Sequence, residues 1–182
     1  MESVDAQDQQ APPMSGIVVE GGVEVRDGDR FGELEEGGYG SKEGRSFLLR
    51  DYEALYLVHS GRLRLRDHAG KDVPFERLAG IAQKGASDAW TKFIVYRDLR
   101  SRGYVVREGF GFGTDLRVYE RGDYPKKAAK YVVFALDEGI EKRISDLQKS
   151  VREMAKMGKE AIIAVIERRG EVIYYKVNRT KF

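Results

Sequence analysis

The stretch GFGFGTDLRVYERG, residues 109–122, places glycines and phenylalanines before a run that ends on Tyr119. It could be a nucleotide-binding glycine loop, an ordinary strand, or a strand that carries a tyrosine to a reaction site. A dinucleotide-binding loop needs a strand before it, a helix after it and an acidic residue about 20 positions later. Here the glycines lie between two predicted strands, which argues against nucleotide binding. The pattern instead predicts a turn with close backbone approach, with Phe110 and Phe112 packed in the core.

Residues that could bind a metal are few and poorly spaced. The chain has no cysteine, and its two histidines, His59 and His68, have no partner at ligand spacing. A magnesium-dependent nuclease of restriction type needs an Asp followed by Glu-x-Lys. Asp115 could be that Asp, but the chain contains no Glu-x-Lys. We therefore expect neither a metal site nor a cofactor.

Basic residues gather in the C-terminal half and alternate there with tyrosines. Solvated surface charge is the default explanation for such runs, but this clustering also favours a polyphosphate partner such as a nucleic acid. The residues concerned are Arg97, Arg100, Arg102, Arg107, Arg117, Arg121, Lys126, Lys127, Lys130, Lys149, Arg152, Lys156 and Lys159.

Length and composition indicate one compact domain or two small ones with a heavily charged surface. The chain has 182 residues, of which 41% are hydrophobic and 34% charged, with a net charge of only +2. Abundant Glu, Arg and Lys, with Asn178 as the only asparagine, is typical of proteins from hot environments. No apolar run approaches the roughly 20 residues that span a bilayer, and the N-terminus does not resemble a signal peptide. These features predict a soluble, cytoplasmic protein.

The elements that must position this chemistry fall into two parts. Residues 1–14 are predicted to be a disordered tail, and residues 15–86 a small α/β domain with a glycine-rich loop at 32–46. Within that domain we expect a hairpin around Gly21-Gly22, then a strand, a short helix and a strand, and last a helix that starts near Pro74.

Residues 87–182 are predicted to form a second, C-terminal domain, with the boundary near Gly85–Asp88. A helix capped by Ser87 should direct Trp90, Phe93, Ile94 and Leu99 toward the core. Three strands, a helix over residues 140–157 and two strands around a turn ending at Gly170 follow. The fold class is therefore α/β (mixed α+β), with a mixed C-terminal sheet and flanking helices.

The order of these pieces resembles a known family. The segments VYRDLRSRGYVVREGFGFGTDLRVYERG, KKAAKYVVF and SVREMAKMGKEAIIAVIERRGEVIYYKV are similar to the C-terminal catalytic domain of the archaeal tRNA-splicing (tRNA-intron) endonucleases. The resemblance covers about residues 88–178, and the N-terminal half fits the family's smaller α/β domain less distinctively. It implies a C-terminal nuclease domain that cleaves RNA without metal, using a tyrosine, a histidine and a lysine.

The resemblance assigns these three positions in this chain. The tyrosine that ends the "DLRVY" strand is Tyr119, and the lysine before the apolar strand "AIIAV" is Lys159. The histidine should open the strand that reads "AAKYVV" here, so Ala128 stands in its place. In the reaction that the family implies, Tyr119 removes a proton from the ribose 2′-OH and Lys159 stabilises the charge that develops on the phosphate. The products are a 2′,3′-cyclic phosphate and a 5′-OH.

A chain without the imidazole lacks the group that protonates the leaving oxygen, so it is expected to be inactive. The loss of one general acid–base group is roughly 10²–10⁴-fold. Ala128 could be a deliberate substitution, or the chain could be a degenerate, non-catalytic structural or RNA-binding subunit. We favour the first interpretation, because degeneration would be expected to erode Tyr119 and Lys159 as well.

The resemblance also implies contacts with precursor tRNA, which the family cuts at a bulge–helix–bulge. Arg152, seven residues before Lys159, matches the arginine that grips a bulge base, and Lys176 is a candidate for a second contact. The "GGYGSKEG" loop resembles an insertion of crenarchaeal-type catalytic subunits, in which Lys42 would reach a phosphate. A solvated helix arginine and a merely mobile surface loop remain the alternatives.

Family members work as two-fold assemblies that join through C-terminal strands and dock an acidic hairpin into a neighbour. The corresponding hairpin here reads "ERRGE", which is mixed in charge. A different subunit would then supply the acidic hairpin. We therefore expect self-association through the C-terminal strands and a heterotetramer of two catalytic and two structural subunits, rather than a homodimer or homotetramer.

Overall fold

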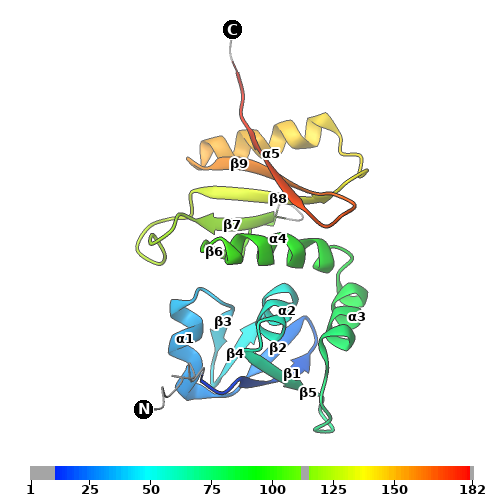
Figure 1. Cartoon of the computed structure of the whole chain (residues 1–182). Helices are drawn as coiled ribbons and strands as arrows, with labels where there is room; N and C mark the ends of the chain where they lie inside the picture. The colour runs from blue at the N-terminus through cyan, green and yellow to red at the C-terminus, as the bar shows by residue number, and fades with distance from the viewer. Residues whose placement is uncertain (1–10, 112–114, 181–182) are drawn as a thin grey trace, which may run out of the picture.

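The computed structural model of the protein describes residues 11–111 and 115–180, and within them the chain forms two five-stranded sheets and five α-helices. Each sheet belongs to one half of the chain, and the helices lie on the sheet faces and between the halves (Figure 1). The predicted mixed α/β fold is confirmed. No helix in these two ranges is long and apolar enough to cross a membrane.

The N-terminal sheet has the strand order β3-β4-β2-β1-β5. Its elements in chain order are β1 (Met14–Val19), β2 (Gly22–Val25), α1 (Phe31–Glu36), β3 (Ser41–Glu43), β4 (Ser46–Leu49), α2 (Asp51–His59) and β5 (Leu63–Arg66). The hairpin predicted at Gly21-Gly22 is confirmed, and both glycines have the positive φ angles that its turn requires. Helix α3 (Phe75–Gly85) follows, with Pro74 as its N-cap, and leads into the second half.

Two expectations about the N-terminal half were wrong. Met14, assigned to the tail, opens β1 and is buried, while residues 1–10 lie outside the described residues. The stretch 32–46, expected to be a loop, contains most of α1, all of β3 and the start of β4. Within it, the turn Gly37–Gly40 between α1 and β3 and residues 44–45 between β3 and β4 lack regular structure.

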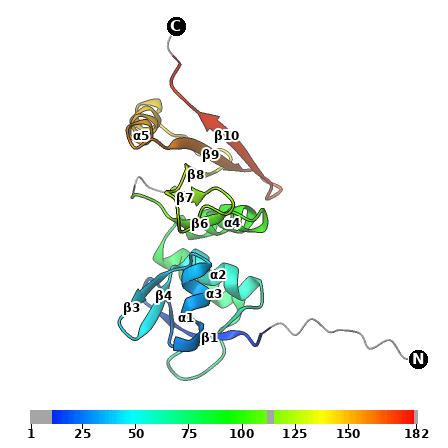
Figure 2. The same cartoon turned by 90° about the vertical axis from the view of Figure 1, so that its left-hand side faces the viewer.

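The C-terminal sheet has the strand order β10-β9-β8-β7-β6 and is sandwiched between two helices (Figures 1 and 2). Strands β8 and β9 are parallel, and the other neighbours are antiparallel. The elements are α4 (Ala89–Ser101), β6 (Val105–Glu108), β7 (Asp115–Tyr119), β8 (Tyr131–Asp137), α5 (Ile144–Lys156), β9 (Glu160–Ile166) and β10 (Val172–Val177). Helix α4 faces the N-terminal half and α5 covers the opposite face.

Both C-terminal helices differ slightly from the prediction. The N-cap of α4 is Asp88 rather than Ser87, and α5 begins at Ile144 rather than at residue 140. Phe93, Ile94 and Leu99 are buried as expected, but Trp90 is 37% exposed. Trp90 lies in the first turn of α4, where its ring packs against Phe93 at the rim of the core.

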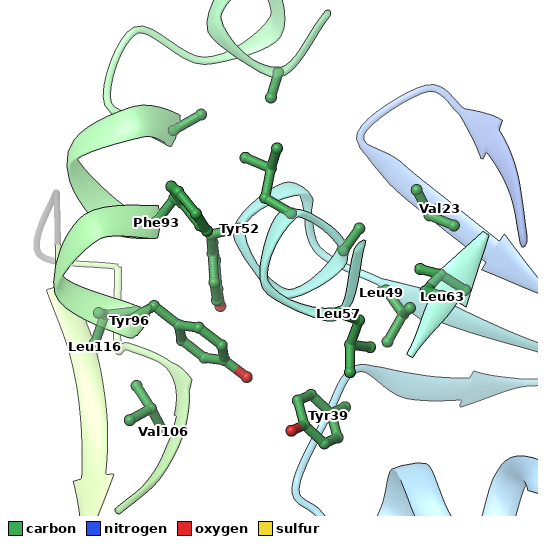
Figure 3. Close-up of a cluster of buried hydrophobic side chains, with 14 of the residues drawn as sticks. Val23, Tyr39, Leu49, Tyr52, Leu57, Leu63, Phe93, Tyr96, Val106 and Leu116 are labelled. Carbon is green, nitrogen blue, oxygen red and sulfur yellow. The ribbon is translucent and has the colours of Figure 1, made fainter. Parts of the chain in front are cut away.

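One hydrophobic core continues from the N-terminal sheet through α2 and α4 to the C-terminal sheet. Figure 3 shows Leu49 and Leu57 on one side and Phe93 and Leu116 on the other, with Tyr52 between them. Burial of apolar surface on this scale is the main favourable contribution to folding. The N-terminal half is therefore packed against the C-terminal half through a shared core.

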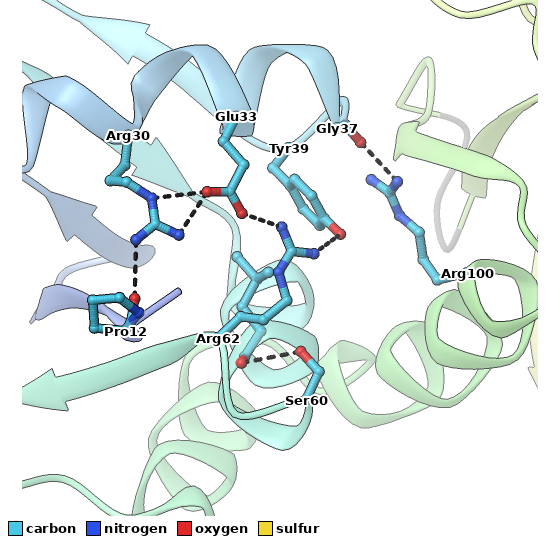
Figure 4. Close-up of polar contacts among 9 residues, drawn as sticks. Pro12, Arg30, Glu33, Gly37, Tyr39, Ser60, Arg62 and Arg100 are labelled. Atoms are coloured by element: carbon cyan, nitrogen blue, oxygen red, sulfur yellow. Dashed lines mark hydrogen bonds and ion pairs between the residues drawn. The ribbon is translucent and has the colours of Figure 1, made fainter. Parts of the chain in front are cut away.

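Arg100, near the C-terminal end of α4, holds the turn that follows α1. Its guanidinium donates a hydrogen bond to the Gly37 carbonyl oxygen at 2.7 Å (Figure 4). It also donates to the Gly38 carbonyl oxygen at 3.1 Å and to the Tyr96 hydroxyl at 2.9 Å. The same group lies 4.2 Å from the centre of the Tyr39 ring. These contacts fix the Gly37–Gly40 turn on α4, so the start of β3 is held by the other half of the molecule.

Candidate functional site

The two faces of the C-terminal sheet can be assigned from its register. Arg117 on β7 pairs with Val132 on β8, and Val132 pairs with Ala161 on β9. Directly paired residues place their side chains on the same face of a sheet. Val132 and Ala161 pack with Met154 of α5, so this row faces α5. Residues two positions away on each strand point to the same side.

Tyr119 and Lys159 both belong to that α5 face, at the same end of the sheet. Val118 pairs with Tyr131, and Tyr131 pairs with Glu160. The next row toward this end of the sheet contains Tyr119 at the end of β7 and Lys159 just before β9. Strand β8 lies between these two positions. Adjacent strands lie about 4.8 Å apart, so the two backbones are separated by about 10 Å. Both long side chains can therefore approach a group bound above this end of the sheet.

The ammonium of Lys159 is fixed beside position 128. Lys159 Nζ donates a hydrogen bond to the Ala129 carbonyl oxygen at 2.6 Å, and the Lys159 side chain is half-buried. Ala128, the preceding residue, is exposed and comes three residues before β8 begins. A longer side chain at position 128 would have open space in front of it. The structure thus brings the lysine and the position of the expected histidine together.

The Phe110 ring, in the turn after β6, lies over the Lys159 ammonium rather than in the core. The Phe110 ring centre is 5.6 Å from Lys159 Nζ and 5.2 Å from the guanidinium carbon of Arg117. Phe110 is 36% exposed, so the expectation that it packs in the core was wrong. Cation–π attraction between the ring and its two basic neighbours explains its position. Phe112 lies outside the described residues.

Asp115 holds this turn in place. Its buried carboxylate accepts a hydrogen bond from the Phe110 amide. A Cβ atom at Gly109 would overlap the same carboxylate, so only glycine fits there. The close backbone approach predicted for the glycine-rich stretch is confirmed at Gly109. Asp115 acts as an acceptor for the backbone, which argues against its use as a metal ligand.

Possible metal-ligating side chains are dispersed in residues 11–111 and 115–180. No group of three or more His, Cys, Asp or Glu side chains converges in these ranges. His59 is the last residue of α2, where its ring packs against Phe75 and Phe93, and His68 lies in the turn after β5.

Lys130 lies between Tyr119 and Lys159 in the row, but its charge is directed elsewhere. Lys130 Nζ forms an ion pair with Glu120 at 2.6 Å, and the Tyr131 hydroxyl donates to the same carboxylate at 2.9 Å. The hydrogen bond from Lys130 lowers the pKa of Glu120, and the bond to Glu120 raises the pKa of Lys130. Lys130 is thereby engaged at the strand end, whereas the Lys159 ammonium is bound to the backbone one residue after position 128.

A groove of about 720 Å³ runs between α5 and the strands β9 and β10, and Lys159 lies at its border. Arg152, exposed on α5, lines the same groove together with the apolar side chains of Leu147 and Val151. The groove therefore combines an apolar floor with positive charge at its rim. Arg152 and Lys159 thus both line this groove.

Lys176 and Lys42 are placed differently. Lys176 also borders the groove, but it pairs with Ile162, which puts it on the sheet face opposite to Lys159. Its ammonium forms an ion pair with Glu160 at 2.9 Å. Lys42 is exposed on β3 in the N-terminal half, and within the described residues it contacts neither Tyr119 nor Lys159.

Sequence reasoning missed several residues around Tyr119. Arg117, two residues earlier on β7, was singled out only as one of many basic residues, although strand alternation places it on the face of Tyr119. Phe110 and Tyr124 come from turns, and no periodic signal marks them. The ring of Tyr124 packs edge-to-face on Tyr119, with centroids 5.0 Å apart and an interplanar angle of 82°.

Comparison with known proteins identifies the family to which this chain is similar. Residues 89–174 match the family model described as the catalytic C-terminal domain of tRNA intron endonuclease, and residues 14–79 match its N-terminal domain. The chain belongs to the tRNA intron endonuclease family. The match to the catalytic domain covers Tyr119, Ala128, Arg152 and Lys159, so the site lies inside the part that gives the family its activity.

Curated tRNA-splicing endonucleases of archaea are similar to this family member along most of its length. The protein from Methanococcus vannielii is 35% identical over 159 residues, which are 87% of this chain and 90% of that protein. The protein from Pyrococcus furiosus is 32% identical over 145 residues, or 80% and 83% of the two chains. The protein from Thermococcus onnurineus is 31% identical over 152 residues, or 84% and 82%. The resemblance to archaeal tRNA-splicing endonucleases is confirmed, and with it membership in a family of intron-cleaving enzymes.

Proposed function

We propose that this chain is a cytoplasmic subunit of the catalytic type in a tRNA-splicing endonuclease that cuts precursor tRNA at bulge–helix–bulge sites. The observation that supports this most is the hydrogen bond from Lys159 to the carbonyl next to position 128, on the sheet face and at the sheet end that carry Tyr119. In this proposal residues 87–182 are the catalytic domain and residues 15–86 the N-terminal domain.

The proposed reaction needs no metal. Tyr119 removes the proton from the ribose 2′-OH, the oxygen attacks the adjacent phosphorus, and the 5′-oxygen leaves. The Lys159 ammonium stabilises the charge that develops on the phosphate oxygens. A free phenol has a pKa of about 10 and is mostly protonated at neutral pH. The proposed reaction therefore needs cations close to the phenol, because they favour the phenolate. Arg117 and Lys159 are basic groups on the face of Tyr119, and Lys130 on the same face is paired with Glu120. The products are a 2′,3′-cyclic phosphate and a 5′-OH.

Ala128 removes the group that would protonate the leaving 5′-oxygen, and we propose that the chain is inactive for this reason. The rest of the site supports a substitution at one position over general degeneration. Lys159 keeps its hydrogen bond, and Phe110 is held over it by Asp115. We therefore favour a deliberate replacement of the histidine, made to stop cleavage, over the natural decay of a structural subunit.

The groove beside α5 is the proposed place for the unpaired bases of the bulge. A guanidinium at its rim, such as that of Arg152, can stack on a splayed base, and the apolar floor suits the base itself. Lys176 is the second contact that we propose on β10. It must exchange Glu160 for the RNA, so we expect it to contribute less than Arg152.

The proposal that this subunit is of the crenarchaeal type depends on the β3–β4 hairpin, which carries Lys42. In a chain with histidine at position 128, Lys42→Ala is expected to slow cleavage of irregular bulges by about 3- to 10-fold, because one ammonium–phosphate contact is lost. Single-turnover cleavage assays measure this, with Lys71→Ala, an exposed lysine in the turn after β5, as the control. A rate unchanged by Lys42→Ala would refute a role for this hairpin.

Assembly is proposed to use the edge of the C-terminal sheet. Strand β10 is one of the two edge strands of this sheet, and Ile173 and Tyr175 on it are 36% and 52% exposed. An uncovered edge with apolar side chains favours pairing with another chain. We propose that two copies join here and that two structural subunits complete a heterotetramer. Gel filtration of this chain should give a dimer alone and a larger complex with the partner. A monomer that gains nothing from the partner would contradict this assembly.

The alternative is a non-catalytic, RNA-binding subunit of the same kind of assembly. The variant Ala128→His distinguishes the two. Cleavage of a bulge–helix–bulge RNA in the presence of EDTA supports the catalytic type, whereas binding without cleavage supports the alternative. Cleavage that EDTA abolishes would instead indicate a metal-dependent nuclease.

A further inference from the structure

Tyr119 does not stand alone at the end of β7. After it the chain turns back toward β8, and this turn carries Tyr124, whose ring packs edge-to-face on the Tyr119 ring. Such contacts between aromatic rings restrict both partners more than apolar burial alone does. The contact lies beside the phenol to which the proposed function assigns the proton transfer.

Tyr124 is in turn held by Arg107 of β6. Arg107 Nη1 donates a hydrogen bond to the Tyr124 hydroxyl at 3.3 Å, and Nη2 donates to the Gly40 carbonyl oxygen at 2.8 Å. One guanidinium thus joins Tyr124 to the turn that precedes β3. Arginine suits this task because its donors have a fixed planar arrangement.

The Gly37–Gly40 turn also packs directly on Tyr124. A Cβ atom at Gly38 would lie 3.2 Å from two ring carbons of Tyr124, which is tighter than ordinary contact. Gly38 has a φ of +66°, so glycine is favoured there for its backbone conformation as well. Tyr124 is therefore enclosed by Tyr119 on one side and by the N-terminal half on the other.

We propose that Tyr124, held by Arg107 against the Gly37–Gly40 turn, is a positioning residue for Tyr119. The proposal rests on the proposed function, since it gives Tyr119 the role of base. A tyrosine at a strand end can rotate about its side-chain bonds, and a misplacement of about 1 Å can cost about 10²-fold in rate. The edge-to-face contact restricts that rotation. Through Arg107, the N-terminal half thereby contributes to the geometry of the site.

Two substitutions separate the ring from the hydroxyl in a chain that carries Ala128→His. Tyr124→Leu removes the aromatic contact and is expected to lower the single-turnover rate at saturating RNA by about 10- to 100-fold. Tyr124→Phe keeps the ring and is expected to stay within about 3-fold, because one neutral hydrogen bond is lost. RNA binding should change by less than about 2-fold in both, because Tyr124 is not proposed to contact substrate. Equal rates for Tyr124→Leu and the parent would overturn the proposal.

A double-mutant cycle tests whether the effect acts through Tyr119. If Tyr124 positions Tyr119, then Tyr124→Leu should add little to the loss already caused by Tyr119→Phe, because the group that it positions is gone. A loss of the same size in both backgrounds would show that Tyr124 supports the fold and not the phenol, and this would also overturn the proposal.

A measurement without catalysis keeps this inference separate from the proposed function. In the chain with Ala128, the ring resonances of Tyr119 can be assigned in NMR spectra by comparison with Tyr119→Phe. Tyr124→Leu is expected to shift them, because the neighbouring ring is lost, and Tyr124→Phe to shift them less. Unchanged Tyr119 resonances in Tyr124→Leu would overturn the positioning role. An inactive Ala128→His chain with shifted resonances would instead refute the proposed function alone.

Discussion

Ala128→His is expected to raise the rate of RNA cleavage by roughly 10²–10⁴-fold, the range that one well-placed general acid contributes. Position 128 is exposed, so an imidazole can be accommodated without displacing a neighbour. The hydrogen bond from Lys159 to the Ala129 carbonyl oxygen already places the ammonium beside position 128. The measurement is single-turnover cleavage of a bulge–helix–bulge RNA in EDTA, with analysis of the product ends.

The size-matched control is Ala128→Gln, which adds a polar side chain that does not titrate. It should stay near the rate of the parent. In the histidine variant, Tyr119→Phe and Lys159→Met should each remove most of the gain. The imidazole must carry a proton to act as the acid, whereas the base must have lost one. Loss of the acid above the ordinary histidine pKa of about 6.5 is therefore offset by gain of the base, so the rate should stop rising with pH there. A histidine variant that is no faster than the glutamine variant would contradict the proposed role of position 128.

Arg100→Ala is expected to lower the free energy of unfolding by about 3 kcal/mol, because a charged donor is removed from several acceptors at once. Arg100 donates to the carbonyl oxygens of Gly37, Gly38 and Val106, and without it these groups of the junction lose their partner. Equilibrium denaturation with urea measures the change. Arg100→Lys should also be destabilising, since an ammonium cannot reach the same set of acceptors.

Arg102, two residues later, provides the matched control for Arg100. It is exposed and forms an ion pair with Asp98 at 2.8 Å, one turn earlier on the same helix. Exposed pairs of this kind contribute less than about 1 kcal/mol, so Arg102→Ala should be nearly neutral. Equal losses for the two variants would show that the junction does not depend on Arg100.

The regular elements could be predicted because their signals are local. The hairpin β1–β2 follows from two β-rich runs that meet at Gly21-Gly22, and β9 follows from a short apolar run after a charged helix. The stretch 32–46 could not be predicted, because its contacts come from distant residues. Glu53 accepts the amide hydrogen of Gly40, and Arg100 binds Gly37. A helix of six residues and a strand of three carry too little periodicity to be read without them.

The candidate site shows the same division. Tyr119 and Lys159 could be located from the motifs that surround them, but their common face and end follow from the pairing of β7, β8 and β9. Phe110 was expected to pack in the core from a turn with close backbone approach. Instead, the buried Asp115 holds the turn, so that the ring lies over Lys159. The partner of Tyr119, Tyr124, lies in a turn whose course the sequence does not specify.

The most direct test of the central claim is a crystal structure of the chain with Ala128 bound to an uncleaved bulge–helix–bulge RNA. The account predicts that the scissile phosphate lies within about 3 Å of Lys159 Nζ and that the adjacent 2′-OH lies within hydrogen-bonding reach of the Tyr119 hydroxyl. It also predicts open space at position 128 on the side of the leaving oxygen. A scissile phosphate bound at another face of the sheet, with Tyr119 and Lys159 both free of RNA, would contradict it.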